Sequence, residues 1–144
     1  MPVPRPTPGA LRSACPIAGA LDILGDRWTL LVLRDALFFG RSRFDEFLAS
    51  PEGISSRTLA ARLQRLERHG ILRREPYQER PPRYRYVPTP KGRDLVPLPR
   101  EAVLWGARHV RGTAKPSPAQ LRALIAGRPP SAGHAASEAR RGHP

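Results

Sequence analysis

The sequence predicts a mainly α-helical domain that carries one small β-hairpin. Apolar residues recur at helical spacing in four successive segments between residues 15 and 70. Two short strand-like segments follow, and a further helical segment ends before residue 112. Three packed helices followed by a β-hairpin form a winged helix-turn-helix, which is the fold class that we expect.

The first two helices have clear start and stop signals. Proline directly after Cys15 is typical of the first position of a helix, and Gly25 is expected to end that helix. Asp26 is expected to cap the next helix, over residues 28–39. Apolar residues lie on nearly every side of this second helix, so it should be central in the domain.

A short third helix is predicted next. Ser42 followed by Asp45 resembles a capping box, with aspartate in place of the usual glutamate. The helix that it opens would turn three apolar side chains in one direction: Phe44, Phe47 and Leu48.

Residues 53–70, GISSRTLAARLQRLERHG, predict an amphipathic fourth helix. Ser55 is a favourable N-cap, and Gly70 is a stop signal. The other faces are rich in arginine, for which solvation is the ordinary explanation. Three leucines fall within about 60° of arc at helical spacing and predict a stripe that faces the core: Leu59, Leu63 and Leu66.

Residues 71–77 and 83–87 predict the two strands of the hairpin, and residues 78–82 predict its loop. Arginines and tyrosines alternate in the second strand, so the two kinds of side chain lie on opposite faces. We expect the arginines to face phosphate and Tyr84 and Tyr86 to face the core. Stacking of these tyrosines on RNA bases is the alternative.

A final helix is expected to begin at Thr89-Pro90. Prolines at positions 97 and 99 should interrupt it, because proline lacks the N–H that a helix interior needs. The helix would then resume over residues 100–110.

The chain as a whole divides into three regions. Residues 1–12 predict a Pro-rich flexible arm, and residues 13–111 the folded domain. Residues 112–144 are basic and rich in proline, alanine and glycine, which predicts a disordered tail. Within that tail, residues 119–126 are compatible with two helical turns.

Positive charge dominates the composition. The 144 residues include 25 lysines and arginines against 12 aspartates and glutamates, a net charge of +13. All but Lys91 and Lys115 of these cations are arginines, which suit bidentate contacts with phosphate and guanine. Such a charge favours DNA, RNA or an anionic membrane surface as partner. A general bias toward arginine, alanine, glycine and proline is the competing explanation.

The charge is concentrated at one end of the folded domain. Residues 54–93 hold eleven cations and three anions, whereas the rest of residues 16–110 holds six cations and eight anions. We therefore expect the fourth helix to enter the major groove of double-stranded DNA, while the hairpin reaches the neighbouring backbone. The DNA-binding residues predicted on the helix are Ser55, Ser56, Arg57, Thr58, Ala61, Arg62 and Arg65. Those predicted on the hairpin are Arg80, Arg83 and Arg85.

Other classes of protein find less support in the sequence. A single cysteine excludes an internal disulfide framework and a multi-cysteine zinc site, and we expect no metal and no cofactor. No Ser/His/Asp grouping or phosphate-binding glycine loop is present, so we do not expect an enzyme. No apolar run approaches the roughly 18 residues of a membrane span, and we expect a cytoplasmic location.

Seven short motifs occur in order between residues 15 and 108. They are Cys15-Pro16, Leu24-Gly25-Asp26-Arg27-Trp28, Arg43-Phe44-x-x-Phe47, Ile54-Ser55-x-x-x-Leu59-x-x-x-Leu63-x-x-Leu66-x-x-x-Gly70, Pro81-Pro82-Arg83-x-x-Tyr86, Thr89-x-x-Gly92-x-x-Leu95 and Trp105. Together these motifs resemble one family, the HxlR-type transcriptional regulators of bacteria.

This resemblance implies a homodimeric repressor that binds inverted-repeat operators. The N- and C-terminal helices that flank the winged helix-turn-helix would be its dimerisation helices. Some members respond to electrophiles or oxidants through a cysteine at the position of Cys15, and a small-molecule effector is another possibility. The residues expected at the dimer interface are Ile17, Leu21, Leu24, Val103 and Trp105.

Two alternatives stay open. Cys15 at a helix N-terminus should have a lowered pKa and raised reactivity, but a small buried residue with an inert thiol would fit the same position. The high net charge also fits a general nucleic-acid-binding protein, associated with the nucleoid or the ribosome, that lacks sequence specificity.

Overall fold

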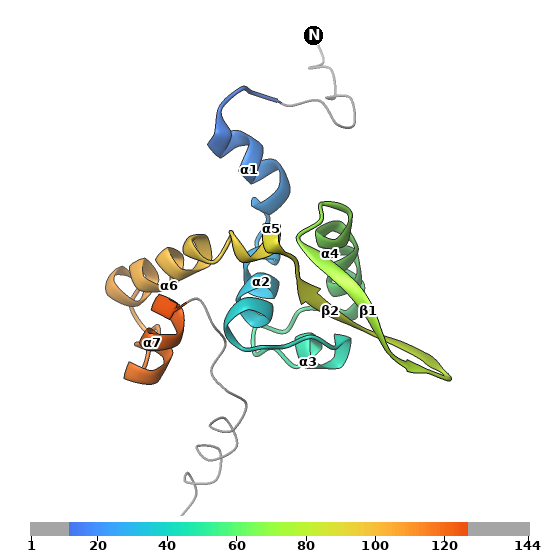
Figure 1. Ribbon diagram of the computed structural model, residues 1–144. Coiled ribbons are helices and arrows are strands. Elements are labelled where there is room, and N and C mark those ends of the chain that lie inside the picture. The colour runs from blue at the N-terminus through green and yellow to red at the C-terminus, as the bar shows by residue number, and fades with distance from the viewer. Residues whose placement is uncertain (1–11, 127–144) are drawn as a thin grey trace, which may run out of the picture.

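The computed structural model describes residues 12–126 (Figure 1). Its helices and strands follow the predicted order, and the prediction of a mainly α-helical fold with one hairpin is confirmed. The arm predicted over residues 1–12 lies outside the described residues except for its last member, as does the tail beyond residue 126. The elements are α1 (Pro16–Leu24), α2 (Thr29–Phe38), α3 (Phe44–Leu48), α4 (Ser56–Arg68), β1 (Leu72–Glu79), β2 (Pro82–Pro88), α5 (Pro90–Arg93), α6 (Pro97–His109) and α7 (Pro118–Ala126).

Helix α2 lies at the centre, as its apolar sequence predicts. Its side chains are buried on several sides, and Leu33 is completely inaccessible. The leucine stripe of α4 packs against the same core with exposures of 0–1%, so the predicted core face of this helix is confirmed. From α3, Phe47 is buried and Phe44 packs at the edge of the core. Leu48 is 38% exposed and does not share that face, contrary to our expectation.

The predicted ends of α2 and α4 are also confirmed. The Asp26 carboxylate accepts hydrogen bonds from the backbone N–H groups of Trp28 at 3.0 Å and Thr29 at 3.1 Å, which fixes the start of α2. The Ser55 hydroxyl accepts the N–H of Thr58 at 3.1 Å at the start of α4. Gly70 follows α4 with a φ of +68°, a conformation that glycine adopts without steric cost.

The capping box predicted for α3 is wrong. The helix begins one residue later, and the Glu46 carboxylate accepts the N–H of Arg43 at 3.3 Å. Ser42 and Arg43 are occupied elsewhere, because the Ser42 carbonyl accepts the N–H of Tyr86 at 2.7 Å and Arg43 forms an antiparallel bridge with Arg85. These two residues are extended and attach β2 to the helical core.

The hairpin is longer than the sequence indicated. The pairing of β1 with β2 is antiparallel and extends to Glu79 opposite Pro82, so the connecting loop is shorter than residues 78–82. Figure 1 shows its tip projecting beyond the helices. Tyr86 packs against the core as expected, whereas Tyr84 is 39% exposed and lies under the guanidinium of Arg74, 4.4 Å from its ring centroid.

The helix predicted to begin at Thr89-Pro90 is interrupted as expected, because α5 ends at Arg93 and α6 begins at Pro97. The Thr89 hydroxyl caps α5 by accepting the N–H of Gly92 at 3.1 Å. The position of the prolines differs from the expectation, since Pro97 and Pro99 form the first turn of α6, where backbone N–H groups have no intrahelical acceptor and proline loses nothing. The two turns that were compatible with residues 119–126 are present as α7. Leu124 of α7 is buried and belongs to the hydrophobic core cluster. That part of the predicted tail therefore packs on the domain.

Candidate nucleic-acid interface

The N-terminal turn of α4 presents polar side chains to solvent. Ser55, Ser56, Arg57 and Ala61 are exposed, and Thr58 is half-buried. The Ser55 hydroxyl also donates to Thr58 Oγ1 at 2.9 Å, which holds these two side chains together at the helix start. Because Ala61 is small, the surface between its longer neighbours stays low. This turn exposes hydroxyl and guanidinium groups, which are donors of the kind that can bind base edges in a major groove.

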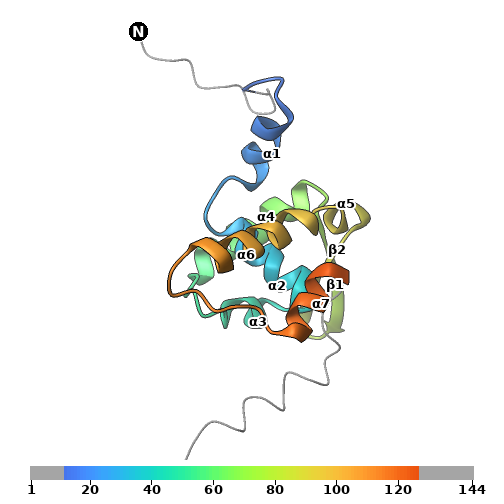
Figure 2. The same ribbon diagram turned by 90° about the vertical axis from the view of Figure 1, so that its left-hand side faces the viewer.

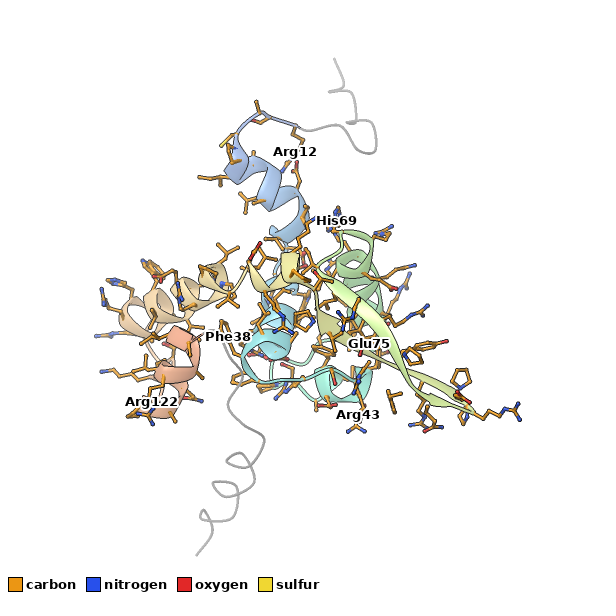
Figure 3. The ribbon with its side chains drawn as sticks, viewed as in Figure 1. Arg12, Phe38, Arg43, His69, Glu75 and Arg122 are labelled. Atoms are coloured by element: carbon orange, nitrogen blue, oxygen red, sulfur yellow. The ribbon has the colours of Figure 1, made fainter. Side chains whose placement is uncertain are left out.

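Arg57 and Arg68 are the exposed cations of α4, near opposite ends of the helix. Within residues 12–126, neither of them forms an ion pair. Figure 3 shows nitrogen-tipped side chains along the outer side of α4 and at the tip of the hairpin. Both guanidinium groups are therefore accessible to a polyanion.

Arg62 and Arg65 were expected to face phosphate, but both side chains are bound to other parts of the protein. Arg62 Nε donates to Asp26 Oδ1 at 2.8 Å, and Arg65 donates to the backbone carbonyl of Asp22. Burial by itself would raise the pKa of Asp26, but hydrogen bonds from Thr29, the backbone and Arg62 outweigh it and hold that pKa below its usual value. Arg62 thus connects α4 to the segment between α1 and α2, and Arg65 connects α4 to α1 itself.

On the hairpin, the three predicted arginines are all exposed, but their partners differ. Arg85 Nε lies 3.2 Å from Glu75 Oε2, and Arg73 binds the other oxygen of the same carboxylate. Among residues 12–126, Arg80 and Arg83 form no ion pair. The positive charge that remains uncompensated is therefore at the tip of the hairpin.

Arg74 is a structural residue that the sequence did not single out. It lies 3.8 Å from Glu67 of α4 and over the ring of Tyr84, so it joins β1, β2 and α4. Its partners come from two other elements, and only the alternation of charge in β1 could have indicated it. This contact helps to set the angle between hairpin and helix.

Cys15 is exposed at the N-terminus of α1. The backbone N–H groups of Ala18 and Ile17, in the first turn of α1, lower the pKa of the Cys15 thiol. The alternative of a small buried residue is therefore not what the structure shows. A lowered pKa increases the fraction of thiolate, which is the reactive form of cysteine.

Helix α1 extends away from the rest of the domain (Figures 1 and 2). Two of the expected interface residues on it are solvent-exposed, Ile17 by 70% and Leu21 by 54%. Trp105 on α6 is 63% exposed. Leu24 instead is buried in the core, and Val103 packs against the core from α6. Leu24 was thus placed wrongly at an intermolecular surface, because its helix ends inside the domain.

In residues 12–126, no helix is both long enough and apolar enough to cross a bilayer. The same residues contain no cluster of three or more histidine, cysteine or acidic side chains that could hold a metal ion.

Curated relatives share this part of the chain. The uncharacterized HTH-type transcriptional regulator sll1512 of Synechocystis sp. is 44% identical over 84 residues, 58% of this chain and 62% of that protein. YdeP of Bacillus subtilis, also named an uncharacterized HTH-type transcriptional regulator, is 37% identical over 95 residues, 66% of this chain and 73% of YdeP. The chain thus covers about three fifths of the length of sll1512. These names agree with the expectation that the chain is not an enzyme.

Solved structures share the fold. The redox regulator HypR in its oxidized form is 34% identical, with a TM-score of 0.61 over 66% of this chain and 97% of HypR. The reduced form of the transcriptional regulator YodB from B. subtilis is 29% identical, with a TM-score of 0.55 over 71% of this chain and all of YodB. Residues 23–113 match the HxlR-like helix-turn-helix family. This match includes more than half of the chain, and the protein belongs to the HxlR-like helix-turn-helix family.

Proposed function

We propose that this protein is a sequence-specific DNA-binding repressor that acts as a homodimer on an inverted-repeat operator. The observation that carries the proposal is the exposed first turn of α4, where Ser56, Arg57 and Thr58 lie at the N-terminus of the helix. The N-terminal residues of a recognition helix contact base edges in helix-turn-helix proteins. The unpaired arginines at the hairpin tip would bind the neighbouring phosphates.

Dimerisation would supply the second half of the contact with the operator. The exposed Ile17 and Leu21 on the projecting α1, with Trp105 on α6, form apolar surface that a single subunit leaves in water. A two-fold dimer would present two copies of α4 to half-sites about one helical turn apart. Leu21→Glu should therefore lower the apparent mass in sedimentation and weaken operator binding together.

Cys15 is the proposed site of redox control. It is exposed and its thiol has a lowered pKa, and HypR, which has a similar fold, is a redox regulator. Because the chain has a single cysteine, oxidation would join Cys15 to the second subunit or to a small thiol. Operator binding is to be measured with and without diamide or a quinone, in the wild type and in Cys15→Ser. Identical responses of the two proteins would exclude Cys15 as a sensor.

A general nucleic-acid binder is the second candidate, favoured by the net charge of +13. Selection of bound sequences from a random DNA pool, followed by titration at several salt concentrations, separates the two functions. A repressor should enrich an inverted repeat and bind it at least about a thousandfold more tightly than random DNA. Equal affinity for both DNAs, with a steep salt dependence, would favour the general binder.

A further inference from the structure

A cavity of about 490 Å³ lies between α2, α6 and α7. Figure 3 shows Phe38 on the side of α2 toward these two helices. Helix α7 lies outside the region that matches the family, so this chain builds one wall of the cavity from its own C-terminal segment. The apolar side of the lining comes from Phe38, Phe39, Val103, Ala123 and Leu124, with Gly106 between them.

The charged groups of the lining leave one positive charge uncompensated. Arg34 and Glu52 form a bidentate pair, with N–O distances of 2.6 and 2.9 Å, and Arg34 also binds Asp35 at 2.8 Å. Lys115, from the segment between α6 and α7, also lines the cavity and is exposed. Within residues 12–126 it forms no ion pair. An apolar cavity with a single unpaired ammonium group is complementary to an apolar ligand with one negative charge.

We propose that this cavity is an effector site for a small organic anion, with an aromatic or aliphatic body against the apolar lining and a carboxylate-like group toward Lys115. The volume is in the range of about 300–1,000 Å³ in which proteins bind small molecules. The regulatory part rests on the proposed function, since it requires that the protein bind an operator.

The wall of the cavity is connected to the DNA-binding helix. Glu52 lies in the turn between α3 and α4, three residues before the N-cap Ser55. Ser50 in the same turn bonds to both Glu52 and Arg34. Because Arg34 and Glu52 line the cavity, a ligand in it would contact the pair that holds the segment before α4. By thermodynamic linkage, the ligand and the operator then change each other's affinity by the same factor.

Binding is tested by isothermal titration calorimetry of the full chain with 2-naphthoate and with its neutral analogue 2-naphthylmethanol. The key variant is Gly106→Leu, because a Cβ at Gly106 meets no atom within 4 Å and the added side chain enters open space. Leucine also favours a helix more than glycine does, so α6 should remain folded. Ala126→Leu adds the same side chain at the end of α7, outside the cavity lining.

We expect Gly106→Leu to weaken naphthoate binding at least tenfold and Ala126→Leu to leave it unchanged. Lys115→Gln should weaken naphthoate roughly two- to fivefold, the strength of an exposed ion pair, and leave 2-naphthylmethanol unaffected. Saturating naphthoate should also change the operator affinity of the wild type and have little effect on that of Gly106→Leu. Without naphthoate, the two proteins should bind the operator equally.

Three results would refute the ligand site. The wild type fails to bind naphthoate, or Gly106→Leu binds it as tightly as the wild type does. In the third, Gly106→Leu changes the dissociation constant of the dimer, which would mean that a second subunit occupies the cavity. Naphthoate binding with unchanged operator affinity would refute the effector role. A wild type that binds naphthoate but prefers no DNA sequence would refute the proposed function and still support the ligand site.

Discussion

The Asp26 side chain accepts a hydrogen bond from the Thr29 hydroxyl and makes two further contributions to stability that substitutions can separate. It caps α2 through the N–H groups of Trp28 and Thr29, and it pairs with Arg62 of α4. An N-cap contributes about 1 kcal/mol to the free energy of unfolding. The ion pair, whose two side chains are 27% and 22% exposed, should add about 0.5–1 kcal/mol.

Asp26→Ala removes both contributions and should lower the free energy of unfolding by about 2 kcal/mol. Asp26→Asn keeps an oxygen that can accept the two N–H groups but loses the charge, so it should cost only about 0.5–1 kcal/mol. In thermal denaturation followed by circular dichroism, these losses correspond to Tm decreases of roughly 8 °C and 2–4 °C. All proteins must be compared at one concentration, because association of subunits shifts Tm.

A double-mutant cycle with Arg62→Ala isolates the pair. We expect a coupling energy of about 0.5–1 kcal/mol between Asp26→Asn and Arg62→Ala. Equal destabilisation by Asp26→Asn and Asp26→Ala would refute the separation of cap from ion pair. A coupling energy of zero would show that Arg62 is not held by Asp26 in solution and is available for phosphate, as the sequence alone had indicated.

Further predictions concern the DNA surface and one carboxylate. Arg57→Ala should cost about 1–3 kcal/mol of operator binding and relax base preference, and its control Arg68→Ala, at the other end of α4, should leave base preference unchanged in a selection experiment. Arg83→Ala should weaken operator and random DNA alike and reduce the salt slope by about 1, measured by fluorescence anisotropy. Hydrogen bonds from Arg34 lower the pKa of Glu52 from 4.5 to about 2. Because the pKa of Glu52 is lower in the folded state, the ionised carboxylate stabilises the protein above pH 4.5, and this stabilisation is lost as the pH falls toward 2. Glu52→Gln should therefore make the free energy of unfolding fall less steeply between pH 4.5 and 2.

Much of the fold could be predicted because it depends on groups close together in sequence. A carboxylate three residues before a helix, such as Asp26, or a hydroxyl at the N-cap, such as Ser55, meets the nearest unpaired N–H groups wherever the helix packs. The leucines of α4 at helical spacing must share one face, and that face is buried. The order of the motifs and the concentration of arginine are also properties of the sequence alone. They were enough to indicate the family and the expected partner.

The tertiary structure decided which of those arginines are available. Arg62 and Arg65 look like Arg57 in the sequence, but their partners Asp26 and Asp22 lie 36 and 43 residues earlier in the chain. The burial of Leu124, which makes α7 a wall of the cavity, likewise depends on α2 and α6. An ion pair or a cavity requires distant segments to approach within a few ångströms, and helical spacing within one segment contains no information about that approach.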